Sequence, residues 1–311
     1  VLALVFALYF FYQGVPDLST ILGIALFAVI IIIIGIEFVA GVKEEGTKKN
    51  LIEIGIALVI VVALWFGLQA VLNTSTPLDV VPSCSMLPAL HRGDLVALQG
   101  VNNVSQLHAP VLNVTSSTYQ QMTGNIGSEE LACVAYAQSN NQLSISPYGY
   151  ILPGYSVGLY RSSYTGGYIV QQQAGNLIQY QCGVENVKFN NGTEGKEAAL
   201  TSITIGNTTI TGDRNNTIIV YKTVPSDLFY QEGDTYIVHR IYAIINASGN
   251  YYTLTKGDNN PGLDLQYSNY PSAMSDIQGK VVAGIPYLGY LKLILSGSFN
   301  EPAQCSGTLQ G

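Results

Sequence analysis

Three apolar runs fill most of the first 72 residues and constrain the fold more than any other feature. They cover residues 1–12, 18–42 and 51–72. A helix needs about 20 apolar residues to cross a bilayer, so only the second and third runs are long enough. We interpret 1–12 as the end of a span that begins before Val1, the alternative being an interfacial segment. The sequence therefore predicts a helical transmembrane anchor of about three spans, the first incomplete, over residues 1–72.

The charges between these runs predict how the anchor is oriented. Lys43, Lys48 and Lys49 lie between the second and third runs, whereas residues 13–17 hold no Lys or Arg. Loops that carry an excess of Lys and Arg stay in the cytosol. We therefore expect a multi-pass protein of the cell membrane whose chain lies outside the cell from about Asn73 onward.

The composition of the predicted outer part agrees with this topology. Seven N-x-Ser/Thr triplets, which are acceptors for N-glycosylation, occur there and none occurs earlier. Charged residues make up only 11% of the chain and its net charge is −7, which argues against nucleic acid as a partner. The glycosylation candidates are Asn73, Asn103, Asn113, Asn191, Asn207, Asn215 and Asn246.

Short β-branched and aromatic runs, separated by Gly, Asn and Pro, recur throughout the outer part. Such runs are typical of strands, and no stretch after the apolar runs keeps a period of 3.6 residues. The expected fold class is therefore a membrane protein with an α-helical anchor and an all-β extracellular domain.

One segment of the outer part carries candidate chemistry. Residues 80–94 read V-V-P-S-C-S-M-L-P-A-L-H-R-G-D and follow the last apolar run after a short polar spacer. Within them Ser85 is held on a turn in which Pro88 prevents helix formation. A serine hydroxyl becomes a nucleophile only when a base takes its proton.

Three histidines are available as that base: His91, His108 and His239. His239 alone lies in a strand-like alternation, Y-I-V-H-R-I over 236–241, which would fix its ring. An imidazole accepts a proton near neutral pH without deep burial. A third stretch, T-K-G-D-N-N over 255–260, supplies a carboxylate that could orient the base.

At these three stretches the chain resembles signal peptidase I of the archaeal and endoplasmic-reticulum type. The resemblance rests on the motifs S-x-S-M-x-P, I-V-H-R and K-G-D-N-N with a second Asp six residues later, and on a closing segment similar to residues 279–290. It implies a catalytic set of Ser85, His239, Asp258 and Asp264, with Asp264 as the closer partner of His239 and Asp258 as support. Together with the N-x-Ser/Thr triplets and the three-span anchor, the archaeal-type histidine indicates an archaeal source.

The same resemblance implies an oxyanion hole. Its donors would be the backbone N–H of Ser85 and the hydroxyl of Ser83, which matches a serine of the bacterial S-G-S-M relatives. Cys84 stands where that motif has Gly, and Cys does not reach positive φ without strain. This departure leaves the geometry of Ser83 open.

The comparison with the family also suggests domain boundaries. A β-rich catalytic domain would comprise residues 73–104 and 215–296, interrupted by a β-rich, glycosylated insertion over 105–214 and followed by a tail over 297–311. Four cysteines in an oxidising space suggest disulfides. Within the insertion, Cys133 with Cys182 is the most economical pair. Cys84 either pairs with Cys305 or is a small buried residue.

The predicted function is that of a membrane-bound serine endopeptidase that removes signal peptides from exported preproteins. Its partners would be preprotein signal peptides, the lipid bilayer and other membrane subunits, with no nucleic acid. No metal or organic cofactor is implied, because no His or Cys cluster has ligand spacing. Two alternatives stay open: a catalytically silent signal-peptidase-like subunit or surface glycoprotein of a membrane complex, and an envelope adhesin whose motif matches are accidental.

Overall fold

The computed structural model describes residues 47–310 except 125, 127–128, 141, 164–167, 172–176 and 299–300. The chain divides into two compact units. The first comprises the described parts of Val1–Pro82, Arg92–Ala97 and Gly284–Glu301, and the second comprises Ser83–His91, Leu98–Ala283 and Pro302–Gly311. The predicted spans within 1–12 and 18–42 lie outside the described residues.

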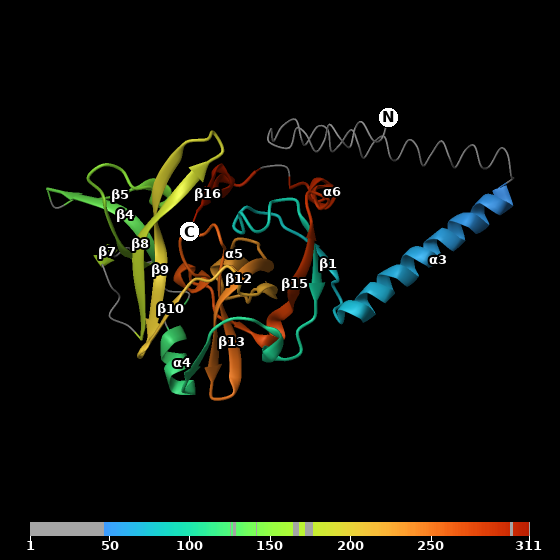
Figure 1. The fold of residues 1–311 in the computed structure, drawn as a ribbon, viewed down its shortest axis with the longest axis horizontal. Coiled ribbons are helices and arrows are strands. Elements are labelled where there is room, and N and C mark those ends of the chain that lie inside the picture. Colours follow the sequence, from blue (N-terminus) through green and yellow to red (C-terminus); the bar gives the residue numbers. More distant parts are fainter. Residues whose placement is uncertain are drawn as a thin grey trace. The chain divides into compact units, whose positions relative to one another are not determined.

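Helix α3, Thr47–Leu72, dominates the first unit (Figure 1). Its apolar segment Leu51–Leu72 is long and apolar enough to cross a membrane, and it matches the third predicted run. Large apolar side chains such as Leu58 and Phe66 are exposed along the whole helix. This is the one such helix in the part of the chain that the structure describes.

The rest of the first unit contains the residues that directly precede and follow Ser83–His91. Strand β1, Leu78–Val80, pairs with the start of β2, Leu95–Gln99, and α6 spans Tyr290–Leu295. The Arg92 side chain donates hydrogen bonds to the carbonyls of Pro82 and Ser298, at 3.1 and 2.6 Å. These bonds fix the chain on either side of residues 83–91.

The second unit is built on one sheet. Strand β2 continues into it beside β15, and the order is then β15-β11-β12-β13-β14 with β3 parallel to the second half of β12. The strands are β3 Val111–Val114, β11 Ile218–Lys222, β12 Tyr236–Ala247, β13 Asn250–Lys256, β14 Ser272–Ala273 and β15 Ile277–Ile285.

Two four-stranded sheets complete the second unit, with orders β10-β9-β8-β16 and β5-β4-β6-β7. Seven of these strands come from residues 129–211, and the eighth, β16, comes from the C-terminal tail and pairs with β8. The strands are β4 Glu129–Ser139, β5 Gln142–Ile145, β6 Ser156–Ser163, β7 Tyr168–Gln171, β8 Ile178–Phe189, β9 Glu194–Ile205, β10 Thr208–Thr211 and β16 Gly307–Leu309.

A shared core joins these sheets. Buried side chains of β4, β6, β8 and β9, such as Leu159 and Ile203, form one cluster with Tyr242 and Ile245 of β12. A second cluster contains Ile219 of β11 and other buried residues of the main sheet. The main sheet therefore contributes to two cores, as a sheet buried on both faces does.

The described chain after α3 is mostly β, but it is not all-β as predicted. Helix α4 spans Ser116–Thr123, α5 spans Leu228–Gln231, and α6 is described above. The hydroxyl of Thr115 caps α4 by accepting the N–H of Thr118. Because α4 is short, its apolar face consists of Tyr119 and Met122, which is too little for a periodicity test to detect. Short 3-10 turns span Val104–Gln106, Pro147–Gly149, Asp264–Tyr267, Met274–Asp276 and Ala303–Ser306.

Candidate active site

Three neighbouring strands place polar side chains on one face of the main sheet. In the register of β11, β12 and β13, Ile219 lies opposite His239 and Tyr221 opposite Ile237, while Ile241 lies opposite Thr255. Because side chains alternate along a strand and opposed residues share a face, Tyr221, His239 and Thr255 project from the same side. All three are at least 95% buried.

A carboxylate reaches this face from the 3-10 turn Asp264–Tyr267. Asp264 Oδ2 lies 2.8 Å from His239 Nδ1, and accepts hydrogen bonds from Tyr221 Oη at 2.8 Å and Thr255 Oγ1 at 2.6 Å. The side-chain amide of Asn269 donates to the Asp264 carbonyl at 3.1 Å. The carboxylate is therefore held by side chains from all three strands, and the turn that carries it is held by Asn269.

The surroundings of Tyr221 in this cluster keep its hydroxyl group protonated. Burial, together with the Asp264 carboxylate, raises the pKa of Tyr221 well above its ordinary value, so the phenol stays a neutral donor. Asp264 Oδ1 has no hydrogen-bond partner among the described residues. All of the interactions that orient the carboxylate therefore converge on Oδ2, the oxygen that faces His239.

The Ser85 hydroxyl lies on the other side of the imidazole. Its Oγ is 3.0 Å from His239 Nε2, and Ser85 is only 5% exposed. The Asn259 backbone N–H donates to the Ser85 carbonyl at 2.7 Å, and the Asn259 side-chain amide donates to the Cys84 carbonyl at 3.1 Å. A Cβ on Gly257 would approach the Ser85 carbonyl oxygen to 2.6 Å, so this close contact requires glycine.

Hydroxyl, imidazole and carboxylate thus form one continuous chain, Ser85–His239–Asp264. Such an arrangement lets the imidazole take the hydroxyl proton while the carboxylate holds the other ring nitrogen and stabilises the imidazolium. Ser83 Oγ lies 3.1 Å from Ser85 Oγ. The Ser83 hydroxyl, one of the two predicted oxyanion donors, therefore lies beside the Ser85 hydroxyl.

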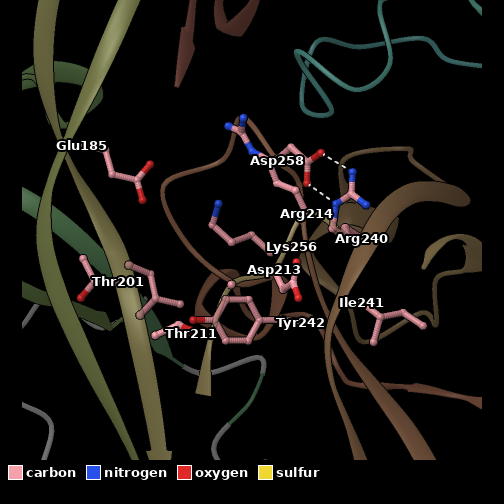
Figure 2. A pocket seen from close by; sticks show the side chains of 12 residues that line it. Glu185, Thr201, Thr211, Asp213, Arg214, Arg240, Ile241, Tyr242, Lys256 and Asp258 are labelled. Carbon is pink, nitrogen blue, oxygen red and sulfur yellow. Dashed lines mark hydrogen bonds and ion pairs between the residues drawn. The ribbon is translucent and has the colours of Figure 1, made fainter. Parts of the chain in front are cut away.

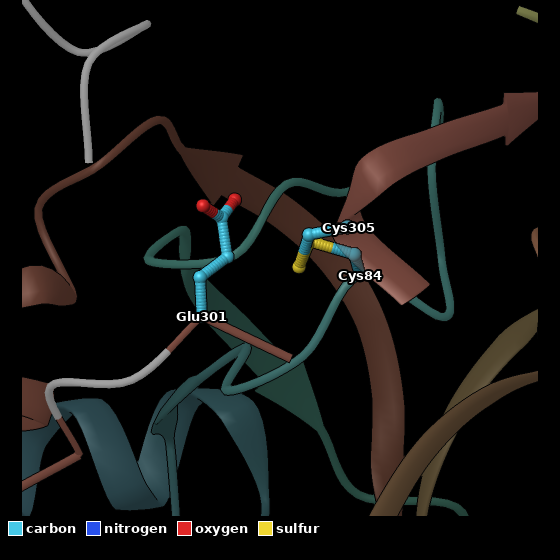
Figure 3. Close-up of side chains that lie close together, drawn as sticks. All are labelled: Cys84, Glu301 and Cys305. Atoms are coloured by element: carbon cyan, nitrogen blue, oxygen red, sulfur yellow. A yellow bond between two sulfur atoms is a disulfide. The ribbon is translucent and has the colours of Figure 1, made fainter. Parts of the chain in front are cut away.

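Two disulfides are present. Cys84 is bonded to Cys305, with an S–S distance of 2.03 Å and a Cα–Cα distance of 5.0 Å (Figure 3). This bond joins the residue before Ser85 to the C-terminal tail. Cys133 is bonded to Cys182, which connects β4 to β8. The sulfur atoms of Cys84 and Cys305 are therefore not thiolates that a metal could bind.

Asp258, the other predicted carboxylate, lies on the opposite face of the sheet. It accepts two hydrogen bonds from Arg240, each 2.8 Å long, and Arg240 lies opposite Lys256 in the register of β12 and β13. These residues line a cavity of about 160 Å³ together with Glu185 and other side chains (Figure 2). The structure therefore brings together Ser85, His239 and Asp264, but not Asp258.

The other candidates are found at the surface. His91 and His108 are exposed, as are six of the seven Asn residues in N-x-Ser/Thr triplets, whereas Asn246 is half-buried. No sequence pattern assigned a role to Tyr221, Thr255 and Asn259, which hold the Asp264 carboxylate and the backbone at Ser85. Strand alternation could have pointed to Tyr221 and Thr255 only if the register of the three strands had been known.

Comparisons with known proteins give a partial similarity. The chain is 43% identical to the signal peptidase complex catalytic subunit SEC11 of Colletotrichum graminicola over 63 residues. These matched residues make up 19% of this chain and 37% of that protein. Over 69 residues it is 41% identical to the subunit of the same name from Verticillium alfalfae, covering 21% of this chain and 40% of that one. The similarity thus spans about two fifths of these relatives. No protein-family model and no solved structure matches the chain.

Proposed function

We propose that this protein is a membrane-anchored serine endopeptidase that removes signal peptides from exported preproteins. The observation that carries the proposal is the chain of contacts from Ser85 through His239 to Asp264, at 3.0 and 2.8 Å. The partial similarity to signal peptidase catalytic subunits supports the choice of substrate. The archaeal type and source stay predictions.

The proposed reaction is an acyl transfer. His239 Nε2 takes the proton of Ser85 as the hydroxyl oxygen attacks the scissile carbonyl. Asp264 holds the Nδ1–H tautomer and stabilises the imidazolium that forms, while Tyr221 and Thr255 keep the carboxylate oriented. His239 then gives the proton to the leaving amine, and water hydrolyses the acyl-enzyme by the same base.

The negative charge of the tetrahedral intermediate needs preorganised donors. In this proposal they are the backbone N–H of Ser85 and the hydroxyl of Ser83. Ser83 must turn its hydroxyl hydrogen from Ser85 Oγ toward the substrate oxygen, which a side chain with one χ angle can do in place. Asp258 has no part in the chemistry, because its carboxylate is engaged by Arg240.

We also propose where the site lies relative to the membrane. Helix α3 is a membrane anchor, residues 1–42 add further spans, and the catalytic domain of 73–104 and 215–296 lies outside the cell. The insertion over 105–214 is glycosylated at its exposed triplets. Other membrane subunits are expected as partners, since the SEC11 relatives are named as subunits of a complex.

The test is cleavage of a preprotein by the full chain in detergent or in proteoliposomes. Ser85→Ala and His239→Ala should each lower kcat/KM by a factor on the order of 10⁴, with unchanged thermal unfolding. His108→Ala is the matched control, because its imidazole is exposed and the Ser85 hydroxyl contacts the His239 ring instead. If Ser85→Ala and His239→Ala both cleave at the wild-type rate, the proposal is wrong. A folded wild-type protein with no activity would favour the silent subunit instead.

A further inference from the structure

The second unit contains a cleft of about 860 Å³ that the proposed chemistry does not use. One wall comes from β4, β6 and β9 of the inserted region and includes Glu130, Tyr160 and Glu197. The other includes Phe229 and Asn259. This volume is within the range of ~300–1,000 Å³ that is typical of ligand sites.

The second wall connects the cleft with the candidate active site. The ring of Phe229 meets the His239 ring edge to face, with 6.2 Å between their centroids. The backbone N–H of Asn259 donates to the Ser85 carbonyl. Phe229 and Asn259 therefore line this cleft and also contact residues of the candidate active site.

The charged groups of the cleft are all acidic. Glu130 and Glu197 line it, and its described lining holds no Lys, Arg or His. Glu197 is only 9% exposed, and its carboxylate has no hydrogen-bond partner among the residues that the structure describes. The Glu197 oxygens are not among the sealed side-chain atoms that lack a partner, and the residue lines the cleft, so the carboxylate is open to a ligand that donates hydrogen bonds.

The electrostatics around Glu197 agree with this view. Burial, followed by the nearby Glu185 carboxylate, raises the pKa of Glu197 to about 7, and Lys256 opposes part of that rise. Burial also raises the pKa of Glu130. A cation beside these carboxylates would favour their ionised forms and gain charge-assisted hydrogen bonds.

Aromatic rings supply the rest of the recognition surface. Tyr150, Tyr160, Tyr267 and Phe229 line the same cleft as the two carboxylates. Aromatic faces attract Lys and Arg side chains and also pack on their aliphatic stems. Carboxylates and aromatic rings together fit a basic side chain better than an acidic or a small apolar one.

We propose that this cleft binds a stretch of the substrate polypeptide near the scissile bond through a Lys or Arg side chain held by Glu130 and Glu197. The inference rests on the proposed peptidase function and adds to it a substrate feature that the inserted region reads. Binding of a basic side chain in this cleft is separate from the selection of small residues at the cleavage site, which requires shallow pockets beside Ser85.

The experiment measures binding and cleavage separately, with full-length protein in detergent. Fluorescent peptides share small residues at the −3 and −1 positions and carry one Lys, norleucine or Glu at each flanking position in turn. Binding is followed by anisotropy with the Ser85→Ala variant, which prevents turnover during the measurement. Cleavage is followed with the protein that retains Ser85.

At one or more flanking positions the Lys peptide should bind about tenfold more tightly than its norleucine partner. Glu130→Gln and Glu197→Gln, each combined with Ser85→Ala, should remove most of that preference. Glu194→Gln is the matched control, because Glu194 is exposed on the same strand as Glu197 and does not line the cleft. Thermal unfolding checks that each variant is folded.

Equal binding of the Lys and norleucine peptides at every position overturns the proposal, and this result needs no variant of the cleft. A Lys preference that survives in both Gln variants overturns it as well. If no peptide is cleaved but the Lys preference depends on Glu130 and Glu197, the cleft binds basic peptides and the peptidase function fails instead. The two failures are therefore distinguishable.

Discussion

Strands β11, β12 and β13 carry two polar clusters that differ in kind, one on each face. On one face Asp264 meets His239, Tyr221 and Thr255 in a cluster at least 95% buried. On the other, Asp258 pairs with Arg240 beside a cavity of about 160 Å³. The first cluster ends at a hydroxyl and can move a proton, whereas the second fixes the loop after β13.

This difference shows how strand alternation separates neighbours in the sequence. His239 and Arg240 are adjacent, yet they project from opposite faces. Asp258 and Asp264 are six residues apart, and each serves one of the two faces. The two aspartates that the sequence places in one candidate catalytic set therefore have different partners: Asp264 contacts His239, and Asp258 pairs with Arg240.

The largest difference between the faces should appear in activity. Asp264→Asn should lower kcat by a factor on the order of 10⁴, because an amide favours the wrong imidazole tautomer. Asp258→Asn should lower it by less than about tenfold, since Asp258 does not contact His239. Single-turnover cleavage by both variants measures the ratio. Equal losses would mean that the two faces do not divide the roles as the geometry indicates.

The second difference should appear in stability. Asp258→Leu leaves the Arg240 guanidinium, which is only 12% exposed, without its carboxylate, and should cost about 3 kcal/mol. The double variant Asp258→Leu/Arg240→Met should lose less than the sum of the two single changes, because neither charge is then left alone. Denaturant unfolding of the cycle gives the coupling, and simple additivity would argue against the ion pair.

A third test concerns Glu197 of β9. Asp264 is held by hydrogen bonds from three strands, whereas burial dominates the surroundings of the Glu197 carboxylate. The folded-state pKa of Glu197, about 7, lies above its ordinary value of 4.5. The stability that Glu197 contributes is therefore complete below pH 4.5 and is lost as the pH rises toward 7.

Glu197→Gln cannot lose a proton, so it should gain stability over the wild type across that pH range. We expect a relative gain on the order of 2 kcal/mol at pH 8 compared with pH 4.5. Thermal unfolding at both pH values measures it, with Glu194→Gln as the exposed control. A gain that does not depend on pH would contradict the assigned pKa.

The smallest effects should come from the side chains that orient Asp264. Thr255→Val and Tyr221→Phe each remove one donor to Oδ2 and should lower kcat about tenfold, with little change in KM. If their role is orientation, kcat should fall while thermal unfolding stays close to that of the wild type. A loss confined to thermal stability would show that these donors are only structural.

Local patterns were enough to predict several features. The apolar run 51–72 coincides with the candidate span in α3, and the alternation over 236–241 lies within β12. Those features depend on residues close together in the chain. The short helix α4 was missed because its apolar face is too small to give a periodic signal.

Residue types and their local order were enough to name the groups available for chemistry. These are one serine on a proline-bounded turn, one strand histidine, and two aspartates in a polar loop. The sequence also determined that four cysteines could pair in few ways. It did not determine which aspartate meets the histidine, nor that Tyr221 and Thr255 stand beside it.

Those contacts follow from the way the chain folds over long sequence separations. Ser85 and His239 are 154 residues apart, and Cys84 and Cys305 are 221 apart. Contacts over such separations follow from which strands pair and in what register, and a shift of one residue would move every side chain to the other face. That register depends on how the buried sheets pack together, and no single stretch of sequence contains it.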